Sequence, residues 1–209
     1  MRGLNRRMVL AALAAAPAGC TSLLPTGGAP PKLYTLTPVS DFPPSATRVH
    51  WQLLVDVPTS TAALNAERIA LSRSPTTVDY FADAAWTDRA PLMVQSVLVQ
   101  SFENSGRITA IARESLALKA DYILQPELRH FEAVYAAAVA PTAHIEIAAK
   151  LVKLPERVII GLRDFDAAAP ATENQIQAIV DAFDAALHRA VPQIIEWTLA
   201  SASERSLAK

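Results

Sequence analysis

The side chains of this chain that could perform chemistry are few and lie far apart in the sequence. The four histidines occur singly, outside the HxxxH and HExxH frames that place two metal ligands on one helix face: His50, His130, His144 and His188. The chain has six glycines, and it contains neither a phosphate-binding glycine loop nor a G-x-S-x-G nucleophile elbow. His50 and His144 fall on the polar side of expected strands, where we expect exposed imidazoles. We therefore predict no catalytic, metal or cofactor site.

The closest approach to a polar cluster lies in the middle of the chain. It combines Ser72-Arg73-Ser74 with three aspartates: Asp79, Asp83 and Asp88. Metal ligation would require these carboxylates on one convergent face, and their spacing does not demand that. We interpret the segment as a solvated loop, and we expect the protein not to be an enzyme.

Cys20 has the clearest chemical role, because it is the only cysteine of the chain. No intrachain disulfide and no multi-thiolate metal site can form. Residues 2–7 are basic, residues 8–16 form an apolar run too short to span a membrane, and small residues precede the cysteine. This order resembles the lipobox of bacterial lipoproteins, in which the signal peptide is cleaved before the cysteine and lipid is attached to it. We predict a signal peptide over residues 1–19 and a lipid anchor on Cys20.

The residues around this cysteine bear on its processing. Pro17 stands where a lipobox usually has an aliphatic residue, so an ordinary secretory signal cleaved near Ala18 is the alternative. Residues 20–31 are rich in proline and glycine, as in a tether. Each buried methylene adds about 0.8 kcal/mol, so several acyl chains anchor a protein firmly. By analogy with bacterial sorting rules, Thr21 after the cysteine implies the outer membrane, on its periplasmic face.

The composition of the rest of the chain predicts one folded domain. Apolar residues make up 51% of the sequence, enough for a core, and we place the domain at residues 32–200 with a flexible tail at 201–209. The chain has 19 basic and 20 acidic residues, and three of the arginines lie in the leader. The mature protein is therefore mildly acidic and lacks the basic face of a nucleic-acid binder.

Periodicity predicts strands over much of this domain. In residues 49–57 apolar and polar residues alternate, which is typical of a half-buried strand. Residues 144–152 and 157–165 flank a turn at 153–156 and predict a hairpin. Further strands are expected at residues 33–37, 68–72, 78–81, 108–112 and 120–131.

Two segments have the period of a helix. The first begins near Asp88 and ends near Ser105, with Gly106 at the position of a C-terminal cap. The second follows Thr172–Gln175, which fits a capping box, and its apolar stripe reaches Thr198. Pro192 lacks an amide donor, so we expect a kink or a break there. The order of elements predicts an α/β domain, a layered mixed sheet with two main helices; two similar strand–helix halves are the alternative.

Short segments along the whole domain occur in a characteristic order. They are Tyr34–Pro38 (YTLTP), Asp56–Pro58 (DVP), Arg68–Ala70 (RIA), Val78–Asp88 (VDYFADAAWTD), Ser105–Ile108 (SGRI), Ala120–Ala133 (ADYILQPELRHFEA), Arg163–Phe165 (RDF) and Ala182–Ala186 (AFDAA). Together they resemble the ABC-type transport auxiliary lipoprotein family, over about Leu33 to Trp197. Ala84-Ala85 departs from the family, which tends to have Ala-Arg before the tryptophan at Trp86.

The resemblance implies a role without a reaction. Such lipoproteins work beside an ABC permease, its ATPase and a substrate-binding protein of the MCE (mammalian cell entry) type, and these systems move lipids or other apolar compounds between the two membranes. We therefore expect a periplasmic accessory lipoprotein with these partners, anchored to the outer membrane. An envelope structural or assembly lipoprotein with no transport role is the alternative.

Two expectations concern packing. Trp86 stands between an expected strand and an expected helix, where we expect it to be buried at their junction. Beyond Pro192, the apolar residues Ile195, Trp197 and Leu199 do not all fit the stripe of the second helix, since successive residues are about 100° apart. Exposed apolar surface there predicts a homo-oligomer or a partner contact. The alternative is that the segment folds back and buries these side chains.

Overall fold

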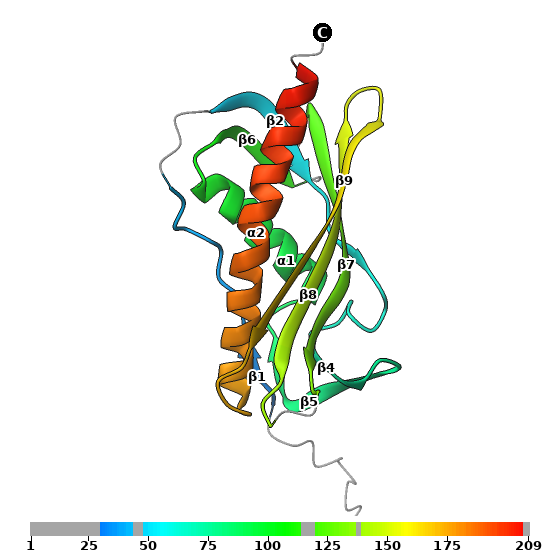
Figure 1. Cartoon of the computed structure of the whole chain (residues 1–209), viewed down its shortest axis with the longest axis vertical. Helices are drawn as coiled ribbons and strands as arrows, with labels where there is room; N and C mark the ends of the chain where they lie inside the picture. The colour runs from blue at the N-terminus through cyan, green and yellow to red at the C-terminus, as the bar shows by residue number, and fades with distance from the viewer. Residues whose placement is uncertain (1–29, 44–47, 114–119, 137–138, 207–209) are drawn as a thin grey trace, which may run out of the picture. The chain divides into compact units, whose positions relative to one another are not determined.

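The computed structural model describes residues 30–43, 48–113, 120–136 and 139–206. Contacts divide the chain into the units Met1–Pro30 and Pro31–Lys209, and every element described below belongs to the second. The expected signal peptide, the lipid anchor on Cys20 and all but the last two residues of the tether lie outside the described residues. This second unit contains nine strands and two helices in its described part (Figure 1).

Three long antiparallel strands form the body of the sheet. They are β7 (Tyr122–Val134), β8 (Thr142–Lys153) and β9 (Val158–Pro170), and β8 pairs with both of the others. The expected hairpin is confirmed by the pairing of β8 with β9. Along β8 the buried side chains alternate with more accessible ones, so one face of the body is apolar and the other is polar.

Shorter strands line the other side of β7 and run parallel to it. They are β2 (Val49–Val55), β3 (Thr59–Ser60) and β4 (Arg68–Ser74). Beyond them, β6 (Ile108–Arg113) pairs with β2, while β5 (Thr77–Trp86) and then β1 (Lys32–Tyr34) follow β4. The sheet therefore forks at β7, with one branch at each end of that strand.

Both helices cover the same face of this sheet (Figure 1). The helix α1 (Ala90–Asn104) packs on β2 and β6, and α2 (Ile176–Ser206) packs along β7, β8 and β9 and touches α1. Their buried side chains join those of the strands in one continuous core. The layered mixed α/β fold is confirmed. The two ends share the body strands in one nine-stranded sheet, and similarity between two strand–helix halves stays a prediction.

The boundaries of α1 agree with the sequence. It begins two residues after Asp88, with proline in its first turn, and ends before Ser105. Gly106 has a φ of 62°, a left-handed conformation that glycine adopts without steric cost. The expected glycine cap is confirmed.

The boundaries of α2 differ from those expected. It begins at Ile176, so the expected capping box at Thr172–Gln175 precedes the helix and does not start it. Asn174 instead accepts a hydrogen bond from the Tyr135 hydroxyl at 2.7 Å, and the Gln175 amide donates to Glu173. The helix also continues to Ser206, past the end expected for the domain.

Pro192 lies inside α2 and does not divide it. The missing amide costs one helical hydrogen bond, but Val191, Ile194 and Ile195 are fully buried on either side of it. Tertiary packing of this kind outweighs local propensity in long helices. Because α2 packs against both the sheet and α1, its buried stripe is wide and also takes in Leu199. The exposed apolar surface expected at Ile195 and Leu199 is therefore wrong, because both are buried; the segment does not fold back as in the alternative, and Trp197 is partly buried.

Candidate functional site

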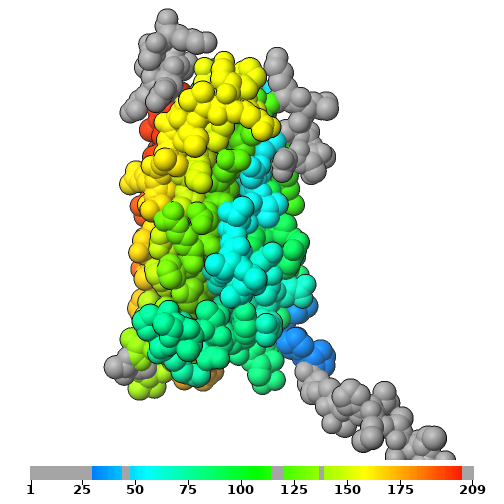
Figure 2. All heavy atoms as spheres, turned by 90° about the vertical axis from the view of Figure 1, so that its right-hand side faces the viewer, coloured from blue at the N-terminus to red at the C-terminus, as the bar shows by residue number. Residues whose placement is uncertain are grey.

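The face of the sheet opposite the helices carries a network of acidic, histidine and arginine side chains, which we call the charged lattice. In Figure 2 this face is turned toward the viewer, and the β4–β5 hairpin lies at its lower end. Register places Glu132 of β7 opposite His144 of β8, and His130 opposite Glu146, which in turn faces Asp166 of β9. Each imidazole therefore lies opposite a glutamate of the neighbouring strand, and Asp166 adds a third carboxylate on β9.

A β-bulge at Arg129 creates this lattice. The register of β7 with β8 shifts between Leu128 and His130, so Arg129 is an extra residue on β7. Before the bulge, even-numbered side chains such as Leu128 face the helices; after it, Phe131 and other odd-numbered ones do. A one-residue shift moves every following side chain to the opposite face. His130 and Glu132 reach the outer face for this reason.

His130, Glu132 and His144 form one cluster, which we call the His–Glu–His cluster. Oε1 of Glu132 lies 2.7 Å from Nδ1 of His130, and its Oε2 accepts the backbone amide of Phe131 at 2.7 Å. The ring of His130 stacks on that of His144 with centroids 4.6 Å apart and planes inclined by 26°. Nε2 of His144 lies 3.2 Å from Oδ1 of Asp166. Backbone and side-chain contacts thus orient each member of the cluster.

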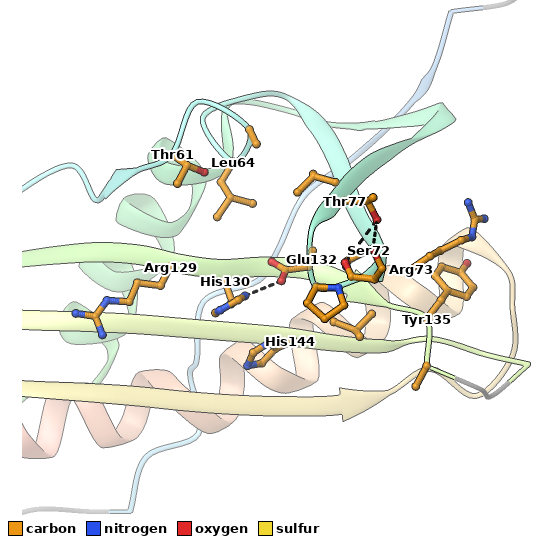
Figure 3. Close-up of a pocket in the computed structure, with 16 residues that line it drawn as sticks. Thr61, Leu64, Ser72, Arg73, Thr77, Arg129, His130, Glu132, Tyr135 and His144 are labelled. Carbon is orange, nitrogen blue, oxygen red and sulfur yellow. Dashed lines mark hydrogen bonds and ion pairs between the residues drawn. The ribbon is translucent and has the colours of Figure 1, made fainter.

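The cluster lies at the wall of a pocket of about 500 Å³. The opposite wall is the β4–β5 hairpin, with Ser72, Arg73 and Thr77, and the turn at Leu64 closes one side (Figure 3). The Glu132 side chain is 12% exposed, whereas 45% of the His130 side chain is accessible. The pocket therefore joins a nearly buried carboxylate to an imidazole that solvent can reach.

Arg129 lies beside the His–Glu–His cluster, and its guanidinium forms ion pairs with three acidic side chains. Its guanidinium lies 3.1 Å from Asp164, 3.3 Å from Glu146 and 3.7 Å from Glu127. The hydrogen bond to Glu146 is the main cause that raises the pKa of Arg129, and Asp164 and Glu127 add to it. This cation balances the outer carboxylates of the lattice.

Tyr135 lies at the end of the pocket, where two influences act on it. Burial raises the pKa of its hydroxyl, and the guanidinium of Arg73, 5.3 Å from the ring centroid, opposes that effect. The hydroxyl donates to Asn174 before α2. Tyr135 therefore connects the pocket to the start of that helix and stays protonated at neutral pH.

The expectations for the histidines are only partly correct. His50 is exposed, as expected. His144 faces outward but is half-buried, and the structure stacks it against His130, a residue that is distant in the sequence. Sequence reasoning missed this pair because histidines on different strands show no fixed spacing. The apolar residues Ile145 and Ile147 on either side of Glu146 indicate which face of β8 is buried. No such pattern in the sequence indicates the bulge at Arg129 that turns the His130 side chain to the outer face.

The polar segment interpreted as a solvated loop lies, apart from Asp88, on the strands β4 and β5, so that interpretation is wrong, and its side chains do not gather as one group. Ser72, Arg73 and Ser74 line the pocket, and Arg73 pairs with Asp79 at 3.8 Å. Asp83 borders a different and smaller pocket, and the Asp88 carboxylate accepts the backbone amide before α1. Within the described ranges, the groups that could hold a metal ion involve none of these aspartates.

Several of the short segments that carry the family resemblance, here called the family-like segments, meet in the core. Trp86, Phe131 and Phe183 come from three of them, and their rings lie 5.1–5.7 Å apart in tilted and edge-to-face contacts. Trp86 is 1% exposed at the junction of β5 with α1, so its expected burial is confirmed. Asp121, from another segment, accepts the backbone amide of Gln52 and so ties β7 to β2. These side chains shape the fold.

The described part of the chain includes no helix that is long and apolar enough to cross a membrane. Among curated proteins, the chain is 30% identical over 175 residues to an uncharacterized protein of Bradyrhizobium diazoefficiens, a match that covers 83% of this chain and 47% of that protein. The chain thus spans about half the length of the curated relative that it matches.

Solved structures show the same fold. A crystal structure from Xanthomonas campestris has a TM-score of 0.79 and 31% identity, and the match covers 84% of this chain and 99% of that one. A second, of an uncharacterized protein, has a TM-score of 0.64 and 14% identity over 80% of this chain and 98% of that one, which shows the fold alone.

The profile of one protein family matches residues 34–195, nearly all of the folded unit. This range contains the two helices up to Ile195, all of the body strands and the His–Glu–His cluster. Its members are described as ABC-type transport auxiliary lipoprotein components, envelope proteins associated with a membrane. This chain therefore belongs to the ABC-type transport auxiliary lipoprotein family.

Proposed function

We propose that this protein is the periplasmic accessory lipoprotein of an ABC/MCE-type transport system that moves lipids or other apolar compounds across the envelope. The observation that carries the proposal is the family match over residues 34–195, which spans the folded unit. Lipid on Cys20 would hold the domain at the outer membrane, and the proline- and glycine-rich tether would let it reach a partner in the periplasm.

The protein would act by binding and not by turnover. In its family-like segments, Trp86 and Phe131 serve packing, and Asp121 accepts a backbone hydrogen bond. A nucleophile with an adjacent base and an oxyanion site would be the signature of an acyl- or phosphoryl-transfer enzyme. We propose that no such reaction takes place here and that the ATPase of the system supplies the energy.

The start of β9 is the surface best suited to the MCE-type partner. Val158, Ile159 and Leu162 are 48%, 51% and 64% exposed, and all three lie near the β8–β9 turn. In the described sheet β9 pairs only with β8, so it is an edge strand. Apolar side chains grouped on an edge strand are characteristic of surfaces that bind other proteins.

Co-purification from native membranes tests this function. Wild-type protein should bring down an MCE-type protein, with its ABC permease and ATPase, and lipid analysis of the complex should identify the cargo class. The double variant Ile159→Glu/Leu162→Glu should lose these partners, because it places two charges in the apolar contact. Val139→Glu, at an apolar residue that is 88% exposed elsewhere, is the matched control and should keep them.

Two results would contradict the proposal. One is wild-type protein that recovers no MCE-type or ABC component from its native membranes; the other is the double variant binding them as well as wild type while its melting temperature is unchanged. Self-association, expected from the sequence, stays a prediction. Light scattering on the full chain in detergent measures it independently.

A further inference from the structure

The His–Glu–His cluster has the composition of a metal site. Each of its members can offer one ligand atom, and these atoms all lie within 4.8 Å of one another. Ligands of one tetrahedral zinc ion lie roughly 3.4 Å apart, given metal–ligand distances of about 2.1 Å. Closing this difference requires rotation of the side chains, which also separates the stacked imidazoles of His130 and His144. We propose that His130, Glu132 and His144 bind a divalent transition-metal ion, with Zn²⁺ as the probe, and leave a fourth position open to the pocket.

Glu132 supplies the negative charge for this ion. Its carboxylate is nearly buried, and within the described residues its ion-pair partner is the imidazole of His130. The neighbouring Arg129 is engaged by Glu127, Glu146 and Asp164. The carboxylate contacts the His130 imidazole and the Phe131 backbone amide, and neither group supplies a full positive charge when the imidazole is neutral, so a dication would provide it.

The hydrogen bonds around the two imidazoles suit ligation. Nε2 of His144 lies 3.2 Å from Asp166; when it donates its proton there, Nδ1 carries the lone pair that a metal requires. In His130, Nδ1 faces Glu132 and Nε2 lies 3.8 Å from Glu146. When the metal takes Nδ1, the proton can reside on Nε2 beside Glu146. Asp166 and Glu146 would thus orient the ligating rings, as carboxylates do behind many metal-bound histidines.

The donor set also selects the kind of ion. Two imidazole nitrogens and one carboxylate suit Zn²⁺, Co²⁺ or Ni²⁺, whereas Mg²⁺ and Ca²⁺ prefer oxygen ligands throughout. The ligands come from β7 and β8, the two body strands that pair along most of their length. The pocket of about 500 Å³ gives the ion a route in and leaves room for water or a partner's side chain.

Metal titration of the full chain tests the inference without reference to transport. The protein is purified in detergent without a histidine tag, stripped with EDTA and titrated with zinc chloride in a calorimeter. Cobalt chloride then reports geometry through the visible absorption band of tetrahedral Co²⁺. We expect one equivalent of Zn²⁺ to bind, with no competition from excess magnesium.

Matched variants locate the site. His144→Gln and Glu132→Gln should each weaken Zn²⁺ binding at least 100-fold and abolish the cobalt band, and Glu132→Gln keeps the size and shape of the side chain if the histidine variant unfolds. Asp166→Asn should cost roughly 10–100-fold, as loss of an orienting carboxylate does elsewhere. His50→Gln removes an exposed imidazole on β2 and should bind as wild type does.

Any of three results would overturn the inference. They are a wild-type protein that takes up no zinc, folded His144→Gln and Glu132→Gln proteins that bind it unchanged, and a loss in His50→Gln equal to that in His144→Gln. Each is independent of the proposed transport role, because a protein that binds zinc but no MCE-type partner would contradict only that role.

Discussion

The Asp184 carboxylate in α2 accepts two hydrogen bonds from Thr37, one from its backbone amide and one from its hydroxyl, each at 2.7 Å. His188, one turn further along the helix, approaches the carbonyl oxygen of Thr37 at 3.0 Å. The chain after β1 is thereby fastened to a helix that begins far later in the sequence. Thr37 and Asp184 belong to the first and last of the family-like segments, so this contact gives both a structural purpose.

Replacing Asp184 with alanine should therefore destabilise the domain. Hydrogen bonds to a charged group contribute roughly 1.5–3 kcal/mol, and the partial exposure of this pair favours the lower end, so we expect a loss of about 2 kcal/mol in the free energy of unfolding. Urea denaturation followed by circular dichroism measures it. Asp181→Ala, on an exposed position of the same helix whose carboxylate accepts a hydrogen bond from the Gln177 side chain, is the control and should change stability by less than about 0.5 kcal/mol.

Trp86→Ala should be more costly, because the indole is fully enclosed between Phe131 and Phe183. Truncation of a large buried aromatic costs about 3–5 kcal/mol. Trp86→Phe should lose less, since it keeps an aromatic ring in the same contacts. Thermal melts of the three proteins give the order. An alanine variant as stable as wild type would contradict the central place of this residue in the core.

Residues with strict local patterns were the predictable part of the fold. The hairpin of β8 and β9, the limits of α1 and the glycine at 106 all depend on neighbours in sequence, through alternation, helical period and backbone conformation. The two-residue strand β3 and the continuous helix through Pro192 depend on distant partners. β3 exists because β7 extends beside it, and α2 stays unbroken because its flanking residues are buried.

The candidate site was harder to predict for a related reason. One bulged residue, Arg129, decides which face receives His130, and register then sets His144 beside it. Both facts arise from pairing between strands, which residue spacing along one strand does not encode. The sequence predicted correctly that His50 is exposed, although the register of β2 with β6 shifts between Val49 and Gln52.

Gly161 should tolerate no larger residue while Trp197 is in place. A Cβ atom at position 161 would lie 2.9 Å from Cζ2 of Trp197, closer than van der Waals contact allows. Overpacking of this kind costs about 1–3 kcal/mol. We expect Gly161→Ala to lose stability within that range in chemical denaturation.

A smaller ring at position 197 relieves the same contact and supplies the control. The Gly161→Ala/Trp197→Phe double variant should lose less stability than the two single changes added together, which is the sign of direct coupling. Simple additivity would show that the cost of alanine at 161 arises from the backbone and not from the tryptophan.

Alkaline pH should destabilise the domain partly through Tyr122. Burial raises the pKa of its hydroxyl above the ordinary value of 10.0, and the nearby charge of Asp121 adds to the shift. Because the folded pKa exceeds the unfolded one, this contribution is fully present below about pH 10 and is lost as the pH rises through the folded pKa. Unfolding free energies measured from pH 9 to 11 should fall more steeply in wild type than in Tyr122→Phe. Equal slopes would contradict the raised pKa.

Lipidation at Cys20 should decide where the protein resides. Intact mass of membrane-extracted protein should show Cys20 as the first residue with acyl chains attached, because the sequence before it has the order of a lipoprotein signal. Cys20→Ala should move the protein out of the membrane fraction. Thr21→Asp keeps the cysteine and should retain the lipid but shift the protein from the outer to the inner membrane in a density gradient. An unmodified Cys20 in wild-type membranes would contradict the anchor, and an inner-membrane position of the wild type would contradict the sorting.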